Sequence, residues 1–319
     1  MHVRSASLRS RSATLVSEAI RPILKRPGSA VVHSVFRSAI NLETAGALVT
    51  LADAGVGPLP NGLIVDLGPD ARRVGIRPGT RVVFEDRAIL FPDAGIAIDL
   101  RIARRWDPRL PWHRAAGLAA AGHWRQAAAR RRRLVAVAAA LLPGARIGLG
   151  ELMPADGTAT DGMILRVARP ALERLEMALR IGDVAAAGHA ARGLVGLGPG
   201  LTPSGDDALV GVAAAACALG GPGAAGFLRP IVADASDRTT LVGAMFLRHA
   251  AAGEFAGRLH RLLAALLDEH DDLLGPAIDE ALGWGASSGA DTLVGVLLGL
   301  DAIAGVGQAA GVSRDQVAA

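Results

Sequence analysis

Tyrosine is absent from this 319-residue chain, aromatic residues make up 3% of it, and Cys217 is the only cysteine. The scarcity of aromatic side chains argues against a surface that stacks nucleic-acid bases. A single cysteine excludes a disulfide framework and argues against a zinc–thiolate site, so we interpret Cys217 as a buried small side chain. No apolar run is long enough to cross a bilayer, and the N-terminus has no signal-peptide core. We therefore expect a cytoplasmic protein that contacts neither membrane nor nucleic acid.

Lysine is almost absent too, since Lys25 is the only one, and the formal net charge is a modest +4. One basic cluster, Arg130 to Arg133, contains no aromatic residue. Recognition of nucleic acid usually needs a clustered basic face, often with aromatic residues. We interpret the cluster as a solvated helix face or a subunit contact, with nucleic-acid binding as the alternative.

Residue composition and the spacing of apolar residues divide the chain into four parts. We predict a basic flexible lead-in over residues 1–28, a β-rich domain over 29–105, an α-helical domain with the Gly-rich motifs over 106–308, and a frayed tail over 309–319. Short β-branched segments separated by Gly, Pro, Asn and Asp are typical of a small barrel or sandwich. Beyond them apolar residues recur every three or four positions, which indicates helices. The predicted fold class is α+β.

Two Gly-rich turns share one pattern. The first is GLGPGLTPSGDDALVGV, at 196–212, and the second is GWGASSGADTLVGV, at 283–296. Aligned on Ser204 and Ser288, both read Ser-Gly-x-Asp-x-Leu-Val-Gly-Val. Such a turn predicts a loop that leads into a helix N-terminus, whose unpaired N–H groups attract anions. Two copies in one chain therefore predict one composite site.

Two interpretations compete for the residues of these turns. Ser204 with Asp207, and Ser288 with Asp291, fit a capping box, which would make them purely structural. Capping does not explain the glycines and prolines of the first copy, nor its doubled acid, so we predict Asp206 and Asp207 as catalytic. The predicted substrate- or phosphate-binding residues are Gly198, Gly200, Thr202, Ser204, Gly205, Ser287, Ser288, Gly289 and Asp291, together with His33 and Arg37 of the β-rich domain.

Carboxylates beside an anion site need an explanation, because like charges repel. Either a divalent cation such as Mg²⁺ bridges them to a phosphate oxygen, or they accept hydrogen bonds from a substrate NH₂ group. The loop is not a P-loop, since no Lys-Ser/Thr pair follows the glycines, and it lacks the β-α-β context of a dinucleotide site.

Other polar groups have structural alternatives. If 30–42 is one strand, His33 and Arg37 share a face, where they could bind an anion or act as acid and base, or simply be solvated. The segment 237–240 could cap a helix that starts near Leu241. His249 and His260 lie in predicted helices, where histidines are more often satisfied structural groups.

Four of these segments, GLGPGLTPSGDD, SSGADTLVG, HSVFRSAINL and GVGPLPNGLIVD, together resemble the DUF2877 family, which includes the AllH subunit of oxamate carbamoyltransferase. The resemblance spans roughly residues 30 to 300. It implies a subunit that works with AllF-like and AllG-like partners and interconverts oxalurate plus phosphate with oxamate plus carbamoyl phosphate, in purine and allantoin nitrogen catabolism. The alternatives are a non-catalytic scaffold subunit and a phosphate- or nucleotide-binding regulatory protein.

Overall fold

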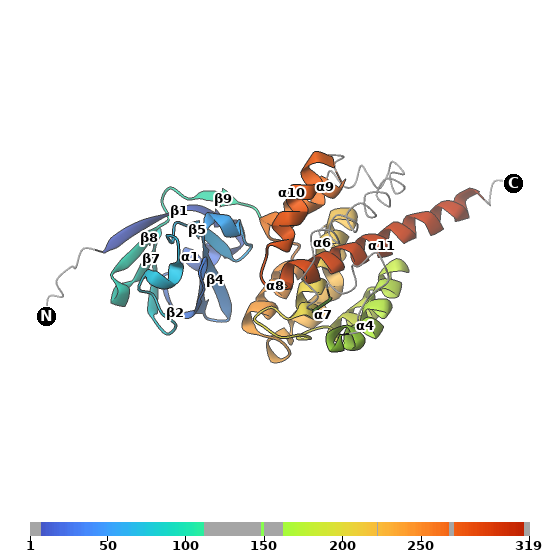
Figure 1. The fold of residues 1–319 in the computed structure, drawn as a ribbon, viewed down its shortest axis with the longest axis horizontal. Helices are drawn as coiled ribbons and strands as arrows, with labels where there is room; N and C mark the ends of the chain where they lie inside the picture. The colour runs from blue at the N-terminus through green and yellow to red at the C-terminus, as the bar shows by residue number, and fades with distance from the viewer. Residues whose placement is uncertain (1–7, 112–147, 150–161, 222, 268–270, 316–319) are drawn as a thin grey trace. The chain divides into compact units, whose positions relative to one another are not determined.

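The computed structural model describes residues 8–111, 148–149, 162–221, 223–267 and 271–315 (Figure 1). The basic cluster at 130–133 lies outside these residues. Backbone contacts divide the chain into an N-terminal unit, Met1–Pro108, and a C-terminal unit, Arg109–Ala319. No helix among the described residues combines the length and apolar character needed to span a membrane.

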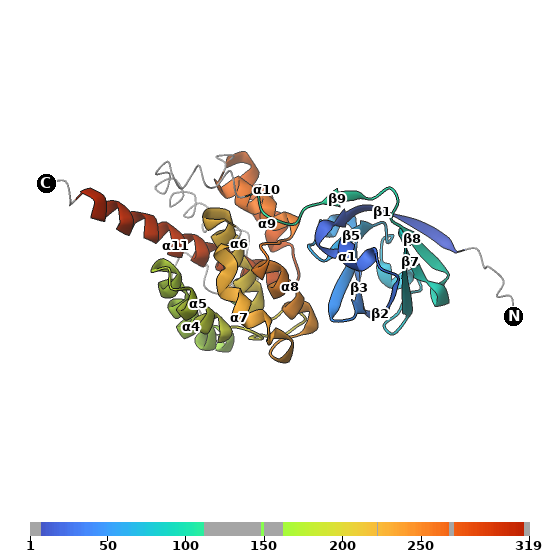
Figure 2. The same ribbon diagram turned by 180° about the vertical axis from the view of Figure 1, so that it is seen from behind.

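The N-terminal unit is a closed β-barrel (Figures 1 and 2). The strand order is β5-β4-β3-β2-β6-β7-β8-β1, and pairing of β1 with β5 closes the ring. Strand β9 pairs in parallel with the last residues of β1. The strands are β1 Arg9–Ser17, β2 Gly28–Val35, β3 Ala39–Thr44, β4 Ala47–Ala52, β5 Gly62–Val65, β6 Arg81–Glu85, β7 Ala88–Phe91, β8 Ile96–Asp99 and β9 Arg104–Trp106. Closure leaves few unpaired strand edges.

Short helices connect some of the strands: η1 Glu18–Ile20, α1 Arg21–Leu24, η2 Ala54–Val56, η3 Ala71–Arg73 and η4 Pro92–Ala94. The barrel interior is filled by alternate apolar residues of the strands, including Leu42, Val49, Phe84 and Ile98. This arrangement confirms the predicted α+β class with a small barrel first.

The prediction of a flexible lead-in over 1–28 is wrong from residue 9 onward. Arg9–Ser17 is strand β1, which pairs with β5, β8 and β9 and so closes the barrel. The polar, arginine-containing start of β1 is exposed, whereas Ala13 and Val16 are buried in the barrel core. Half of this strand therefore carries no apolar pattern, which is why the sequence suggested an unstructured segment.

The C-terminal unit is helical. Its helices are α4 Met163–Arg180, α5 Val184–Arg192, α6 Ser204–Gly220, η6 Ala224–Leu228, α7 Arg229–Val232, η7 Ala235–Asp237, α8 Leu241–Ala251, α9 Gly257–Leu267, α10 Asp271–Leu282 and α11 Ser288–Asp315. Helix α11 continues through most of the segment predicted as a frayed tail. Thr240 caps α8 by accepting a hydrogen bond from the Gly243 N–H at 2.9 Å, as one of the sequence interpretations proposed.

Helix α6 is the centre of this unit, and nearly all of its side chains are buried. A helix that is apolar on every side, here mostly Ala, Val and Leu, is buried on every side. Cys217 lies on it and is buried, which confirms its interpretation as a small core residue. Helix α11 lies directly against α6 (Figures 1 and 2), so the first turns of the two helices meet.

Candidate functional site

The two repeated turns meet where α6 and α11 begin. Ser204 and Ser288 are the first residues of these helices, and both are buried. The residue before α6 is Pro203, which makes no side-chain capping bond, so Ser204 does not cap α6. The capping-box interpretation of the first copy is therefore wrong. The Ser288 hydroxyl instead reaches Thr202 of the first copy, with 2.8 Å between the two oxygens.

Asp206 fastens the Gly-rich loop to the rest of the unit. Its Oδ1 accepts a hydrogen bond from the Gly196 N–H at 2.8 Å, and its Oδ2 accepts one from the Thr239 hydroxyl. The surroundings are tight, because a Cβ on Gly196 would lie 2.1 Å from the Arg238 carbonyl oxygen. Both oxygens of Asp206 are therefore occupied by the protein. The geometry gives Asp206 a structural role, and its catalytic role stays a prediction.

Asp207 has a different environment. It is 6% exposed, and its Oδ2 is buried without a hydrogen-bond partner among the described residues. Burial raises the pKa of Asp207 well above 3.8, hydrogen bonding by Ser288 and Thr202 opposes the rise, and the negative charge of Asp291 adds to it. A neutral carboxyl offers one donor and one acceptor, whereas a carboxylate only accepts.

Asp291, its counterpart in the second copy, holds another segment. Its Oδ1 accepts a hydrogen bond from the Leu149 N–H at 2.6 Å. The adjoining Gly148 has φ +78°, and a Cβ there would lie 2.6 Å from Asp291 Oδ1 and 2.7 Å from Ser204 Oγ. The two aspartates of the repeat therefore have different neighbours. Asp291 accepts from the Leu149 backbone, whereas Asp207 is hydrogen-bonded by the Ser288 and Thr202 hydroxyls.

The glycines of the two turns allow close backbone packing, and their N–H groups bind carbonyl groups of the chain. The N–H groups of Gly205 and Gly289 each donate to a loop carbonyl at 2.9 Å, those of Leu197 and Trp284. A Cβ on Gly205 would lie 1.9 Å from the Leu194 carbonyl oxygen, and one on Gly289 2.1 Å from that of Ala281. The N–H groups of Gly205 and Gly289 are therefore occupied by the chain itself, and a part for these two residues in substrate binding stays a prediction.

The remaining predicted loop residues lie close to the starts of α6 and α11. Gly198, with φ +114°, packs against Ser204, and a Cβ there would lie 3.0 Å from Ser204 Oγ. Gly200, with φ +99°, has open space around it. The Ser287 carbonyl accepts from the Asp291 N–H at 2.9 Å, as the Pro203 carbonyl does from Asp207 at 3.1 Å. Among the described residues, this leaves the N–H groups of Ser204 and Asp206 without a partner at the start of α6.

Comparison with known families agrees with this picture. A family model described as "Oxamate carbamoyltransferase subunit AllH" matches residues 194–300, and one described as "AllH family N-terminal domain" matches residues 10–105. The first contains both Gly-rich turns, and the second coincides with the barrel, β1 included. The chain belongs to the AllH family. No solved structure matches it.

Two further residues of this AllH-family chain lie beside the start of α11. Arg258, in the first turn of helix α9, stacks on Trp284, which belongs to the second Gly-rich motif, with 3.5 Å from the guanidinium carbon to the ring centroid. Both side chains are partly exposed. Trp284 stood within the motif GWGASSG, but no local pattern distinguishes Arg258 from the other arginines of the helical unit.

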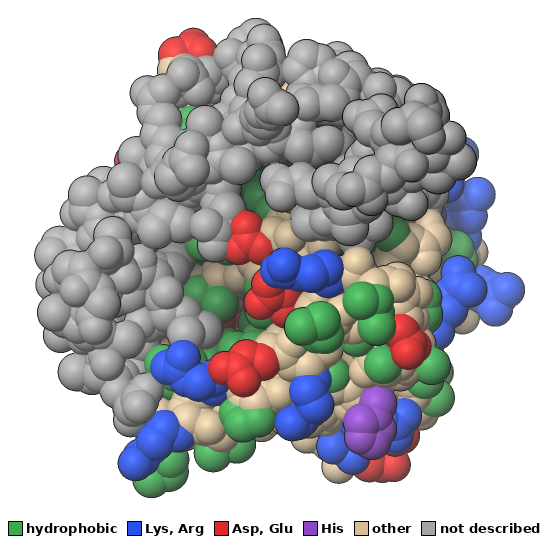
Figure 3. Space-filling view, turned by 90° about the vertical axis from the view of Figure 1, so that its right-hand side faces the viewer, with side chains coloured by type: hydrophobic (Ala, Val, Ile, Leu, Met, Phe, Trp, Pro, Cys, Tyr) green, Lys and Arg blue, Asp and Glu red, His purple; other side chains and the backbone are tan. Residues whose placement is uncertain are grey.

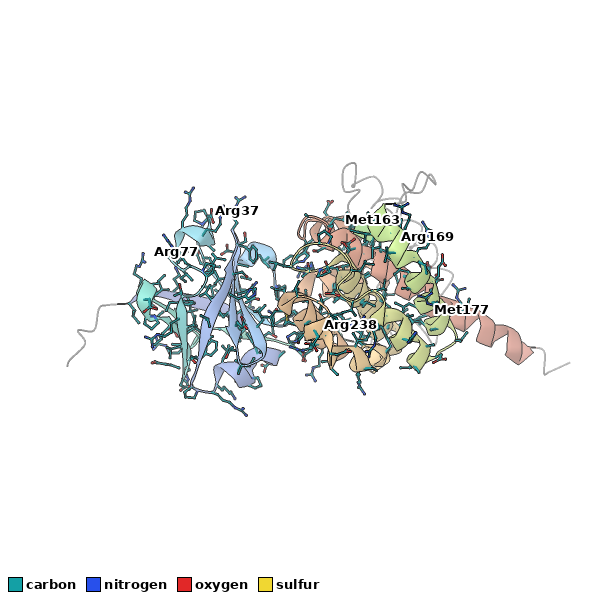
Figure 4. All side chains as sticks on the ribbon, turned by 90° about the horizontal axis from the view of Figure 1, so that it is seen from below. Arg37, Arg77, Met163, Arg169, Met177 and Arg238 are labelled. Carbon is teal, nitrogen blue, oxygen red and sulfur yellow. The ribbon has the colours of Figure 1, made fainter. Side chains whose placement is uncertain are left out.

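His33 and Arg37, predicted to share a strand face, do not. Strand β2 ends at Val35, its register with β3 shifts between Val32 and Ser34, and Arg37 lies exposed in the turn that follows (Figure 4). The predicted strand over 30–42 is thus a hairpin, β2 and β3. Both residues belong to the N-terminal unit, and none of the contacts described above involves them.

The AllH motifs of the barrel are joined by a row of polar side chains on β2, β3 and β4 and at Asn61, the residue before β5. Asn41 donates to Ser34 at 3.0 Å, Thr50 donates to Asn41 at 2.8 Å, and Asn61 donates to Thr50 at 2.7 Å. His33 Nδ1 lies 3.1 Å from Ser34 Oγ at one end of the row. Asn61, at the other end, is fully buried. The row therefore connects HSVFRSAINL with GVGPLPNGLIVD.

Within the described part of the chain, no three His, Cys, Asp or Glu side chains are grouped to hold a metal ion. His249 Nδ1 lies 2.6 Å from Glu254 Oε2, which agrees with its interpretation as a satisfied structural group.

Proposed function

We propose that this chain is a subunit of an oxamate carbamoyltransferase, in which the starts of α6 and α11 bind the carbamoyl or amide group of the substrate. The single observation that supports this site best is Asp207 Oδ2, a buried oxygen without a hydrogen-bond partner among the described residues. A buried polar atom of this kind needs an explanation, and a bound ligand is one. The family name supports the substrate class.

The chemistry of Asp207 fits the ligands of that reaction. Oxamate, oxalurate and carbamoyl phosphate all carry an H₂N–C=O group, which donates through nitrogen and accepts through oxygen. A carboxyl whose pKa is raised by burial stays protonated over a wider pH range, so its Oδ2 can carry the proton and donate to the carbonyl oxygen of that group. The Ser288 and Thr202 hydroxyls, which hydrogen-bond the same carboxyl, would then orient it toward the ligand.

The transfer step also needs stabilisation of negative charge. When a phosphate oxygen of inorganic phosphate attacks the carbamoyl carbon of oxalurate, the carbonyl oxygen gains charge; the C–N bond then breaks, the nitrogen takes a proton, and oxamate and carbamoyl phosphate result. The N–H groups of Ser204 and Asp206, at the positive end of the α6 dipole, are suited to that charge. Loss of one such donor typically costs about 10²–10³ in rate.

Partner subunits are part of the proposal, and we infer AllF-like and AllG-like chains as the partners. Helix α4 carries large apolar side chains on its outer face, among them Met163, 75% exposed, and Met177, 59% exposed (Figure 4). Ile181, just beyond α4, is 68% exposed. Figure 3 shows hydrophobic side chains gathered among arginine and acidic ones on a described face. Exposed apolar side chains of this kind are typical of surfaces that bind other proteins.

The test is reconstitution with the partners. Co-expressed with AllF-like and AllG-like chains, the protein is expected to convert oxalurate and phosphate to carbamoyl phosphate. Asp207→Ala is expected to abolish the conversion, because the ligand loses its hydrogen bond to Oδ2. Asp183→Asn is the matched control: Asp183 caps α5 through the Ala186 N–H, and asparagine caps equally well. Full activity of the Asp207 variant would contradict the proposed role.

A further inference from the structure

Arg258 is positioned at the candidate site by its contact with an aromatic ring. Its guanidinium carbon lies over the indole of Trp284, 3.5 Å from the ring centroid, and the Trp284 carbonyl accepts the Gly289 N–H of the first turn of α11 at 2.9 Å. The Trp284 backbone is thereby attached to the start of α11. Arginine on an aromatic face gains from cation–π attraction and stacking, which also restricts its orientation.

The surroundings of Arg258 leave its hydrogen-bond donors available. Among the described residues no hydrogen bond or ion pair of Arg258 is found, although a guanidinium carries five N–H donors. Arg261, one turn further along α9, differs: its Nε donates to Glu280 at 2.6 Å, and its side chain is 49% exposed. Within the described part of the chain, the two arginines of α9 thus differ: Arg261 is paired with Glu280, and Arg258 is stacked on Trp284.

Arg258 and Asp207 both lie beside the start of α11, because Arg258 stacks on Trp284 and Asp207 is hydrogen-bonded by Ser288, the first residue of that helix. Burial lowers the pKa of Arg258 to about 9, so Arg258 carries its positive charge at neutral pH. A cation and a buried carboxyl group are therefore found at one site.

From this arrangement, and resting on the proposed function, we propose that Arg258, held on Trp284, binds the planar carboxylate of oxamate and oxalurate while Asp207 binds the neighbouring amide. An arginine stacked by its face presents its edge, where two parallel N–H groups match the two oxygens of a carboxylate. Oxamate carries its carboxylate and its amide on adjacent carbons, so it is complementary to this pair. Arginine can also bind phosphate through two parallel bonds, but the position of Arg258 next to the Asp207 carboxyl assigns it to the carboxylate beside the amide.

The experiment compares Arg258→Gln and Arg258→Lys with the control Arg261→Gln in the reconstituted complex. KM for oxamate is expected to rise by about tenfold to a hundredfold in Arg258→Gln, the loss typical of a charged hydrogen-bonded pair. KM for carbamoyl phosphate should stay within about twofold. Arg258→Lys keeps the charge but loses the planar fork, so an intermediate KM for oxamate is expected. Arg261→Gln should leave both KM values unchanged.

Direct binding distinguishes this proposal from the proposed function. In calorimetry on the full chain and on the complex, the wild type should bind oxamate, and Arg258→Gln should bind it about tenfold or more weakly. Oxamate binding that depends on Arg258 supports the role of Arg258 even if the complex transfers no carbamoyl group. In that case the proposed reaction is contradicted and the proposed carboxylate site is not. Unchanged oxamate affinity in both Arg258 variants, a rise confined to KM for carbamoyl phosphate, or no oxamate binding by the wild type would overturn it. If Arg258→Gln does not fold, Arg258→Lys and Trp284→Phe provide the same comparison.

Discussion

Gly211 of α6 and Gly295 of α11 lie at equivalent positions of the repeat and pack on each other's helices in the same way. A Cβ on Gly211 would lie 2.0 Å from the carbonyl oxygen of Thr292, and one on Gly295 would lie 1.9 Å from that of Ala208. Thr292 and Ala208 also correspond in the repeat. The two helices are thus related by a local pseudo-twofold axis, which brings Asp207 and Asp291 to one place.

Because these contacts are to backbone, a side chain at either position forces the helices apart. Gly211→Ala and Gly295→Ala should each lower the free energy of unfolding by at least about 1–3 kcal/mol, the usual cost of overpacking. Urea unfolding measures the effect. Gly226→Ala serves as the control, since nothing lies within 4 Å of a Cβ at that position of η6. Equal stability of all three variants would contradict the close helix contact.

Asp206 is expected to act on stability through the loop it fastens. Asp206→Ala removes the acceptor of the Gly196 N–H and of the Thr239 hydroxyl, and should cost about 1–3 kcal/mol of unfolding free energy. Asp206→Asn keeps Oδ1 for Gly196 and should cost less. Hydrogen exchange at the Gly196 amide should accelerate in the alanine variant. An unchanged exchange rate there would show that the tether does not hold the loop.

Asp207 should make stability depend on pH in a defined direction. Its pKa is raised in the folded state, mainly by burial, so its favourable contribution is complete below about pH 3.8 and is lost as pH rises through the raised value. Asp207→Asn cannot ionise. Its unfolding free energy relative to wild type should therefore increase with pH, by about 1.4 kcal/mol per unit while only the unfolded state ionises. Denaturant titrations at several pH values measure this difference, and a flat or opposite trend would refute the raised pKa.

In the barrel, the row of polar side chains should depend on Thr50. Thr50→Val keeps the shape but removes the hydroxyl that donates to Asn41 and accepts from Asn61, so it should cost about 1–3 kcal/mol. Thr50→Ser keeps the hydroxyl and should cost less. Thr44→Val is the comparison, because the bond from Thr44 to the Ser29 carbonyl is exposed and water can replace it. A Thr50→Val loss no greater than that of Thr44→Val would rule out the row as a source of stability.

The sequence alone determined the order of the two structural classes and the starts of α6 and α11, because these follow from local patterns. β-branched segments between turn residues predicted the barrel strands, and Gly-rich turns before apolar runs predicted the helix starts. The cap at Thr240 was likewise accessible, since a cap acts within one helical turn. Strand β1 could not be predicted in this way, because its partners β5, β8 and β9 lie far along the chain.

Only the tertiary structure decided what each carboxylate of the repeated turns does. Asp206 and Asp207 are neighbours in one motif, yet Asp206 is occupied by Gly196 and Thr239 while Asp207 keeps a buried oxygen without a described partner. The local sequence treats them alike, because their difference comes from residues that reach them from distant segments. Arg258 enters the site for the same reason, since its stacking on Trp284 arises from the packing of α9 near the start of α11.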